Sequence, residues 1–322
     1  MKIFDLHCDT LMECYLNHKP LRDGAMQLNL EKMADGDVAC QCFAIYIPTH
    51  TIAQAFHVTQ TPMDYYNACL QVYRAQLAEN QDWMKPVTGA AEIEEAWREG
   101  TRCAVLTVED GVLLEGDLTR LDGLYADGVR MLSLTHDFEN CIGFPHVECQ
   151  ADNERGLKDF GIEVVKRMNE LGIIVDVSHL SDGGFRDVVR HSQKPFVASH
   201  SCARALGSTS RNLSDELLRQ LGDSGGVCGI NFYPGFLKDG SDYALVDHLI
   251  GHMQHIKQVA GIEAVAFGSD YDGNNGRKEW GDCDGLQQIV DAMSAVFTQD
   301  EIEKICWKNA MRLFRDVVGE RT

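Results

Sequence analysis

The sequence predicts a (β/α)8 barrel of the TIM type, an α/β fold, and three observations support this prediction. Short apolar segments alternate with segments of helical spacing along the whole chain, and eight of the apolar segments are typical of strands. Residue types that bind metals follow most of these eight segments. The first segment is not followed by the glycine-rich phosphate loop of an open doubly wound sheet. We therefore expect residues 1–322 to form one barrel domain with additional helices at its C-terminal end.

The predicted strands are nearly continuous apolar runs, which is typical of strands covered on both faces. In chain order they cover residues 2–10, 38–46, 102–108, 129–134, 173–177, 195–198, 227–232 and 264–267. Cys40 and Cys42 lie within the second run, and we expect both to be core residues.

The segments between the strands carry apolar residues at the spacing of a helix packed on one face. They cover residues 28–34, 62–80, 90–99, 118–126, 160–171, 184–190, 214–221 and 244–259, and two more follow at 286–297 and 300–315. We interpret the residues between the first strand and residue 28 as a polar connection. His248, His252 and His255 share one helical face, which should lie outside the barrel, solvated or packed against other helices.

The charge of the chain excludes some classes of partner. With 29 basic and 49 acidic residues the formal net charge is −20, which disfavours binding to nucleic acid or to an anionic membrane. The sequence shows no leader peptide and no apolar run near the ~18 residues that cross a bilayer. We therefore expect a cytoplasmic protein whose 12 cysteines stay reduced.

The first strand ends in His7-Cys8-Asp9. Because side chains two residues apart point to the same side of a strand, His7 and Asp9 offer an imidazole and a carboxylate together. This pair is half of a divalent-metal site, although an isolated pair of this kind is more often an ordinary polar strand end.

Matching residue types at the other strand ends change that assessment. The carboxyl ends of the strands meet at one end of such a barrel, where chemistry is usually located. The side chains expected there are His7, Asp9, Glu109, His136, His179, His200, Tyr233 and Asp270. The remaining histidines, His146 among them, fall outside the strand ends.

The number of these ligands favours two metal ions over one. Three histidines with Asp9, Glu109 and Asp270 exceed what a single tetrahedral catalytic zinc uses. A glutamate at the centre of such a set can bridge two ions about 3.5–4 Å apart. Paired ions would lower the pKa of a bridging water and polarise a carbonyl oxygen, which is the equipment of a hydrolase.

The sequence resembles the membrane (renal) dipeptidases and their bacterial relatives, within the amidohydrolase-like barrels. The resemblance covers essentially the whole chain. Its motifs are Asp5–Thr10, Glu109–Gly111, Leu134–His136, Asp176–His179, Ser199–Ser201, Ser210–Asn212 and Gly268–Gly273. Other amidohydrolases usually begin His-x-His and often bridge their metals with a carboxylated lysine, whereas this chain has His-x-Asp and a strand-end glutamate.

The resemblance implies a role for each site residue and two Zn²⁺ per subunit. The implied metal ligands are His7 and Asp9 for one zinc, His179 and His200 for the other, and Glu109 as the bridge. Asp270 resembles the carboxylate that moves protons, and His136 resembles the residue that stabilises the oxyanion. Arg211 resembles the residue that binds the terminal carboxylate of the substrate, and Tyr233 an aromatic residue beside the substrate.

The implied activity is hydrolysis of dipeptides, L-L and including those with a D-residue in the second position. The loop after His136 is acidic and lacks the tryptophan of the mammalian members, so the side-chain preference does not transfer. Two alternatives remain open: hydrolysis of another small amide, such as an N-acyl amino acid or a lactam, and a catalytically silent barrel that binds metal or ligand. The implied partner is a small dipeptide, and a homodimer is the candidate assembly.

Overall fold

The computed structural model describes residues 1–147 and 150–319, and it contains a closed barrel of eight parallel strands. In order around the ring these are β1 (Ile3–Cys8), β2 (Val38–Tyr46), β4 (Arg102–Glu109), β5 (Val129–Ser133), β6 (Ile174–Asp176), β7 (Val197–Ser201), β8 (Val227–Ile230) and β10 (Val265–Phe267). Pairing of β1 with β10 closes the ring, with Asp5 opposite Phe267. Each strand corresponds to one predicted from the sequence, so the predicted barrel is confirmed.

Three further strands were not predicted. β3 (Met84–Pro86) pairs with β4 outside the ring, and β9 (Tyr243–Ala244) pairs with β11 (Arg277–Lys278) in a separate two-stranded sheet. Each of the three is only two or three residues long. A strand of that length is too short to show a period of two in the sequence.

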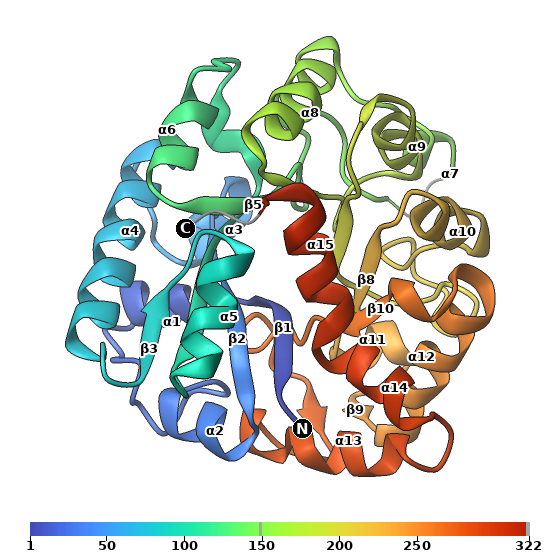
Figure 1. Cartoon of the computed structure of the whole chain (residues 1–322). Helices are drawn as coiled ribbons and strands as arrows, with labels where there is room; N and C mark the ends of the chain where they lie inside the picture. The colour runs from blue at the N-terminus through green and yellow to red at the C-terminus, as the bar shows by residue number, and fades with distance from the viewer. Residues whose placement is uncertain (148–149, 320–322) are drawn as a thin grey trace.

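Helices surround the barrel and also occupy its loops (Figure 1). They are α1 (Thr10–Leu16), α2 (Leu30–Asp35), α3 (His50–Ala55), α4 (Pro62–Glu79), α5 (Ala90–Arg98), α6 (Arg120–Ala126), α7 (Gln150–Asn153), α8 (Asp159–Leu171), α9 (Asp182–His191), α10 (Asp215–Asp223), α11 (Pro234–Leu237), α12 (Val246–Ala260), α13 (Leu286–Met293), α14 (Gln299–Glu303) and α15 (Asn309–Val317). Among the described residues, no helix combines the length and the apolar character that crossing a membrane requires.

One prediction about the segments between the strands was wrong, and one helix differs in its internal geometry. The connection after β1 forms α1, because Thr10, Leu11 and Cys14 are buried there and packing stabilises a helix that the local pattern does not indicate. The helix predicted at 300–315 is confirmed, and it contains a π-helical segment, Lys304–Lys308, between α14 and α15.

Local signals explain where the longest helix begins. Thr61 precedes α4, and its side chain accepts a hydrogen bond from the backbone N–H of Asp64. Pro62 occupies the first helical turn, where its missing N–H costs no hydrogen bond.

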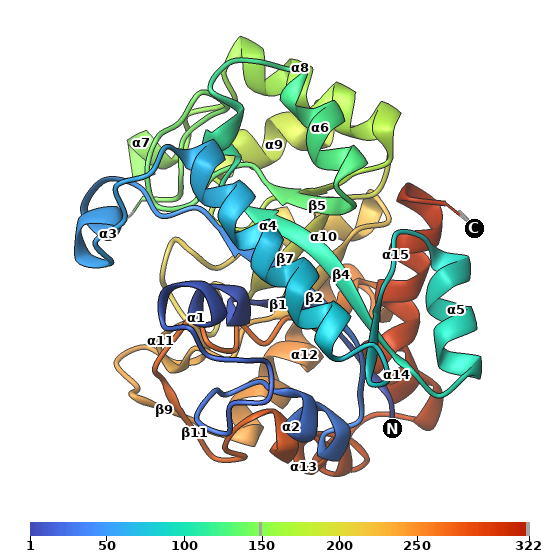
Figure 2. The same cartoon turned by 90° about the vertical axis from the view of Figure 1, so that its left-hand side faces the viewer.

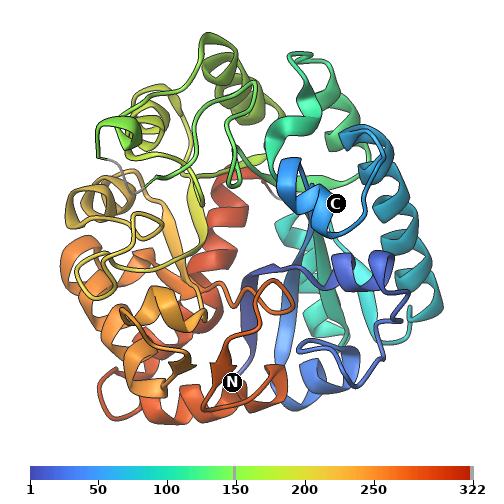
Figure 3. The same ribbon diagram turned by 180° about the vertical axis from the view of Figure 1, so that it is seen from behind.

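One end of the barrel is closed by α15. Strand residues, including Cys42 and Val105, form a buried cluster with Met311 and Phe314 of this helix. Cys40 and Cys42 are completely buried, as predicted. Figure 2 shows α15 and α5 on one side of the molecule and α3, α7 and α11 on the opposite side. Figure 3, turned by 180° from Figure 1, faces this opposite side. The loops that follow the strands lie at the end opposite α15, which is where a site is expected in a barrel of this type.

The histidines of α12 have structural roles, as expected. His252 is fully buried: its Nδ1 accepts a hydrogen bond from the backbone N–H of Ala203 at 3.1 Å, and its Nε2 lies 2.9 Å from the carbonyl oxygen of Leu237. His255 lies 2.7 Å from Asp215 of α10. These contacts tie α12 to its neighbours.

Candidate functional site

A cavity of about 860 Å³ opens at the carboxyl ends of the strands. The sequence analysis assigned nine side chains to the site, and eight of them line this cavity. The ninth, His7, is only 2% exposed. The eight are Asp9, Glu109, His136, His179, His200, Arg211, Tyr233 and Asp270. The structure therefore brings all nine together, although they are spread over more than 260 positions of the chain.

Glu109, at the end of β4, lies between two groups of side chains. Its Oε1 is 3.2 Å from Nε2 of His179 and 3.2 Å from Nε2 of His200. The two Nε2 atoms are 3.0 Å apart. Two ligands bound tetrahedrally at about 2.0–2.1 Å from zinc are about 3.3 Å apart, so these three atoms are spaced like part of one coordination sphere.

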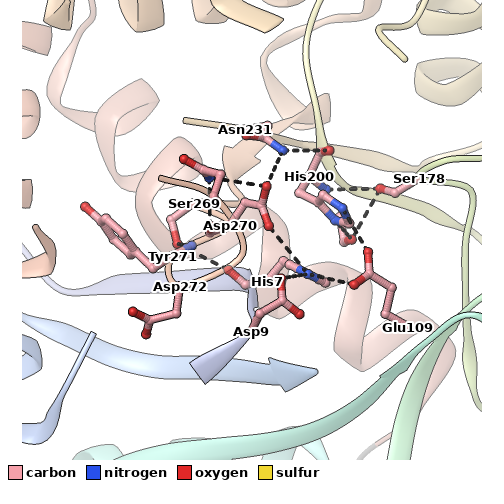
Figure 4. Close-up of polar contacts among 12 residues, drawn as sticks. His7, Asp9, Glu109, Ser178, His200, Asn231, Ser269, Asp270, Tyr271 and Asp272 are labelled. Atoms are coloured by element: carbon pink, nitrogen blue, oxygen red, sulfur yellow. Dashed lines mark hydrogen bonds and ion pairs between the residues drawn. The ribbon is translucent and has the colours of Figure 1, made fainter. Parts of the chain in front are cut away.

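The other oxygen of Glu109 faces the end of β1. Oε2 lies 3.7 Å from Nε2 of His7, which is also 3.5 Å from Oδ2 of Asp9 and 3.9 Å from Oδ1 of Asp270. Figure 4 shows the carboxylates of Asp9, Glu109 and Asp270 converging on His7. These separations are somewhat wider than those around Oε1.

Backbone contacts hold the first and last strands of the ring together at the site. The N–H of Asp9 donates to the carbonyl oxygen of Tyr271 at 2.9 Å, and the N–H of Asp270 donates to that of His7 at 3.2 Å. Asp270 and His179 both have a positive φ, 60° and 66°. Side chains other than glycine rarely adopt this left-handed conformation, and such strain is typical of functional sites.

The donor set fits divalent cations. Nε2 of His7 and Oδ1 of Asp9 are buried and have no hydrogen-bond partner among the described residues. Burial alone would lower the pKa of His7, but the charges of Glu109 and Asp9 raise it to about 10. Burial, and then the charge of Asp9, raises the pKa of Glu109 well above its usual range. Carboxylates buried this closely need a bound positive charge, and imidazoles beside carboxylates are ligands that zinc prefers.

Asp270 follows β10 and is held from one side. Oδ2 accepts a hydrogen bond from Nδ2 of Asn231 at 3.0 Å. Burial, and then the charge of Asp9, raises the pKa of Asp270 to about 6. Gly273 allows this arrangement, because a Cβ at its position would lie 2.1 Å from Oδ2 of Asp9 and 2.4 Å from Oδ1 of Asp270.

His136, after β5, lies over the second group of ligands. Its ring centroid is 4.2 Å from that of His179 and 4.6 Å from that of Tyr46. Burial lowers the pKa of His136 to about 4, so its ring is neutral near pH 7. A neutral imidazole retains one N–H that can donate a hydrogen bond.

Arg211 is the buried cation of the cavity. Its guanidinium donates to Oγ of Ser201 at 2.8 Å and to the carbonyl oxygen of His200 at 2.9 Å. Its Nε is buried without a hydrogen-bond partner among the described residues. Tyr233 lies nearer the opening, 39% exposed, with its ring packed edge to face against Phe236 at 4.9 Å.

The structure adds residues that the sequence analysis did not assign to the site. Asp137 and His146 line the cavity, although His146 was placed with the histidines outside the strand ends. Oδ1 of Asp137 lies 3.2 Å from Nδ1 of His179. Asn231 and Gly273 were not assigned to the site either. Of these added residues, only Gly273 carried a signal in the sequence, because it lies in the Gly268–Gly273 motif.

The chain is similar to known proteins over nearly its whole length. The sequence matches the family described as membrane dipeptidase, peptidase family M19, over residues 1–321. An uncharacterised dipeptidase of Schizosaccharomyces pombe is 32% identical over 298 residues, 89% of this chain and 71% of that protein.

Two solved structures are similar over nearly the whole chain. Dipeptidase AC, a metallopeptidase of family M19, has a TM-score of 0.91 at 26% identity and covers 99% of both chains. A metallopeptidase from Rhodobacter sphaeroides, liganded with a phosphinate mimic of the dipeptide L-Ala-D-Ala, has a TM-score of 0.88 at 26% identity and covers 98% of this chain and 99% of that one.

Proposed function

The chain belongs to the membrane dipeptidase family of metallopeptidases, peptidase family M19, and we propose that it hydrolyses dipeptides at a centre of two zinc ions. One observation supports two ions in place of one. The two oxygens of Glu109 face two separate groups of ligand atoms, with His179 and His200 on one side and His7 on the other. A carboxylate in that position is suited to bridging two cations.

In this proposal His7 and Asp9 would hold one ion, His179 and His200 would hold the other, and Glu109 would contribute to both sites. The chemistry of the donors supports zinc, since imidazole nitrogens and carboxylate oxygens are common zinc ligands. Two bound ions would lower the pKa of a water molecule between them and polarise the carbonyl oxygen of the substrate.

Asp270 moves the proton. Oδ2 is held by Asn231, and Oδ1 faces His7 and the centre of the ligand set. From this position it can take a proton from the attacking water and deliver it to the leaving amine. His136 also lines the cavity, beside His179, and the N–H of its neutral ring can donate to the oxygen that becomes negative during the attack.

Arg211 and Tyr233 bind the substrate. The buried, unpartnered Nε of Arg211 and the planar shape of its guanidinium support a role in binding the terminal carboxylate of a dipeptide. The cavity of about 860 Å³ is large enough for a small ligand. Dipeptides with a D-residue in second position are included among the proposed substrates, since one similar structure is liganded with a mimic of L-Ala-D-Ala.

The test combines metal analysis with a substrate panel. We expect the zinc-loaded protein to contain two equivalents of metal and to hydrolyse some L-L or L-D dipeptides faster than N-acyl amino acids or lactams. Turnover of only the latter compounds would assign a different amide substrate. Two equivalents of zinc without hydrolysis of any amide would overturn the proposed activity and favour a binding protein.

A further inference from the structure

Asp176, at the end of β6, is a buried carboxylate that the proposed mechanism does not use. Its Oδ2 accepts hydrogen bonds from the hydroxyls of Ser133 and Ser199, both at 2.6 Å. Its Oδ1 accepts hydrogen bonds from the backbone N–H groups of Ser178 and Ser199, both at 2.9 Å. Asp176 is 1% exposed, so water does not substitute for these four donors. The carboxylate therefore joins the ends of three neighbouring strands, β5, β6 and β7.

These contacts determine which atom carries each proton. Asp176 accepts all four of these hydrogen bonds, so the hydroxyl of Ser199 donates to it. The oxygen of that hydroxyl lies 2.8 Å from Nδ1 of His200 and is left to act as an acceptor. His200 then carries its proton on Nδ1 and donates it to Ser199. The lone pair of its Nε2 therefore points toward Glu109, 3.2 Å away.

A second contact fixes the backbone of the same histidine. The N–H of His200 donates to Oγ of Ser178 at 3.1 Å, a contact visible in Figure 4. Oγ of Ser178 lies 3.3 Å from Oγ of Ser199, so the two serines belong to one network. Backbone and ring of His200 are thus both held by groups that converge on Asp176.

We propose that Asp176 and Ser199 form a positioning relay that keeps His200 protonated on Nδ1 and directs its Nε2 into the metal centre. The relay rests on the proposed function, because it gives His200 its role as a metal ligand. Groups that bind the second nitrogen of a ligating histidine fix its orientation and raise its affinity for the ion. Here the carboxylate acts through a serine hydroxyl and not by direct contact.

The other histidine of the same pair is held differently. Nδ1 of His179 lies 3.2 Å from Oδ1 of Asp137, whose side chain is 46% exposed. Water can replace an exposed partner of this kind, whereas the hydroxyl of Ser199 is completely buried. Loss of the relay at His200 should therefore be harder to compensate.

Two serines provide a matched test. Ser199→Ala and Ser133→Ala each remove a buried hydroxyl that donates to Oδ2 of Asp176 at 2.6 Å, but only Ser199 contacts the His200 ring. We expect Ser199→Ala to weaken one of two Zn²⁺ sites by about 10- to 100-fold, measured by competition with a chromophoric chelator. Ser133→Ala should retain the affinity of the wild type. Equal affinities in the two variants would overturn the relay.

A second measurement does not depend on metal binding, and its wild-type part does not depend on the stability of a variant. Nitrogen-15 NMR of the metal-free, histidine-labelled wild type should show His200 protonated on Nδ1, as should Ser133→Ala, whereas Ser199→Ala should lose this preference. Protonation of His200 on Nε2 in the wild type would refute the relay. Failure of the wild type to bind zinc, with the Nδ1 tautomer observed, would instead reject the proposed function and leave the orientation of His200 established.

Discussion

Asn231 donates a hydrogen bond from its Nδ2 to Oδ2 of Asp270 at 3.0 Å. Because this oxygen is held, the other oxygen of the carboxylate is turned toward His7 and the centre of the ligand set. Asp270 itself has a left-handed backbone conformation, with a φ of 60°. The contact explains how a residue in the loop after β10 presents one oxygen to the side chains at the end of β1.

The first prediction separates proton transfer from metal binding at Asp270. Asp270→Asn should keep most of the metal, because three histidines, Asp9 and Glu109 remain, and asparagine tolerates a positive φ. We expect kcat to fall by roughly 10²–10⁴-fold, the usual contribution of a positioned acid or base, with a much smaller change in KM. Steady-state kinetics and metal analysis provide the measurement.

Asp316→Asn is a suitable control, because this carboxylate lies on α15, 44% exposed and far in the fold from the cavity end. Loss of metal from Asp270→Asn would show that Asp270 is chiefly a ligand. Full kcat with both metals present would refute the proposed mechanism.

The second prediction concerns the bridge. Glu109→Gln preserves the shape of the side chain but removes the negative charge that the two proposed cations would share. We expect the variant to lose at least one metal ion per chain and to lose turnover, as measured by elemental analysis and dipeptide hydrolysis. Glu163→Gln, at a site 57% exposed on α8, controls for the substitution itself. Full metal content with near-normal activity would remove Glu109 from the bridging role.

The third prediction tests binding of the substrate carboxylate. Arg211→Ala should chiefly raise KM for substrates with a free carboxylate, but it also removes contacts to Ser201 and to the backbone of His200. Arg211→Lys retains the charge and loses the planar fork, so it disturbs these neighbours less. Loss of hydrogen bonds to a charged group corresponds to a rise in KM of about 10- to 100-fold.

The control for this effect lies in the substrate. Dipeptide amides lack the terminal carboxylate, so their KM should change little between the wild type and Arg211→Lys. An equal rise in KM for dipeptides and dipeptide amides would show that Arg211 acts on the cavity in general and not on the carboxylate.

The fourth prediction concerns Gly273, which lies close to the carboxylates of Asp9 and Asp270. A Cβ there would lie 2.1 Å from Asp9 and 2.4 Å from Asp270, well inside normal contact distance. Gly273→Ala should displace both carboxylates, lowering metal content and kcat together. Gly123→Ala on α6, where a Cβ meets no heavy atom within 4 Å, should leave both unchanged. Wild-type metal content and kcat in Gly273→Ala would show that the loop can move aside without consequence.

The fifth prediction is a pH dependence of stability that originates at His252. Burial lowers the pKa of this residue from 6.5 to about 4, and its Nδ1 already accepts a hydrogen bond from Ala203. Between these two pKa values the unfolded chain binds a proton that the folded chain does not. The free energy of unfolding therefore falls as the pH falls through this window, and is fully retained above it.

Replacing His252 by glutamine removes the titrating group. Urea unfolding of the metal-free proteins should show that the wild type loses about 2 kcal/mol more than His252→Gln between about pH 7.5 and about pH 5. Parallel losses in the two proteins would assign the pH dependence to other groups.

The sequence by itself determined the barrel and predicted nine side chains that the structure brings together at one end of it. Its eight apolar runs marked the strands, because a strand covered on both faces must be apolar along its length. The residues after those runs, from His7 to Asp270, were predicted to meet because parallel strands in a closed ring all end on the same side. The helix α1 and the short strands β9 and β11 were missed, because packing and pairing stabilise them where the local pattern is weak.

Only the tertiary structure decided the arrangement within the site. It showed that the two oxygens of Glu109 face different side chains, that Asp137 and His146 reach the cavity, and that the hydroxyl of Ser199 contacts both Asp176 and His200. Contacts of this kind depend on loop paths and on side-chain rotamers across strands that are distant in the chain. Local periodicity indicates which face a residue occupies, but not the atom that it meets there.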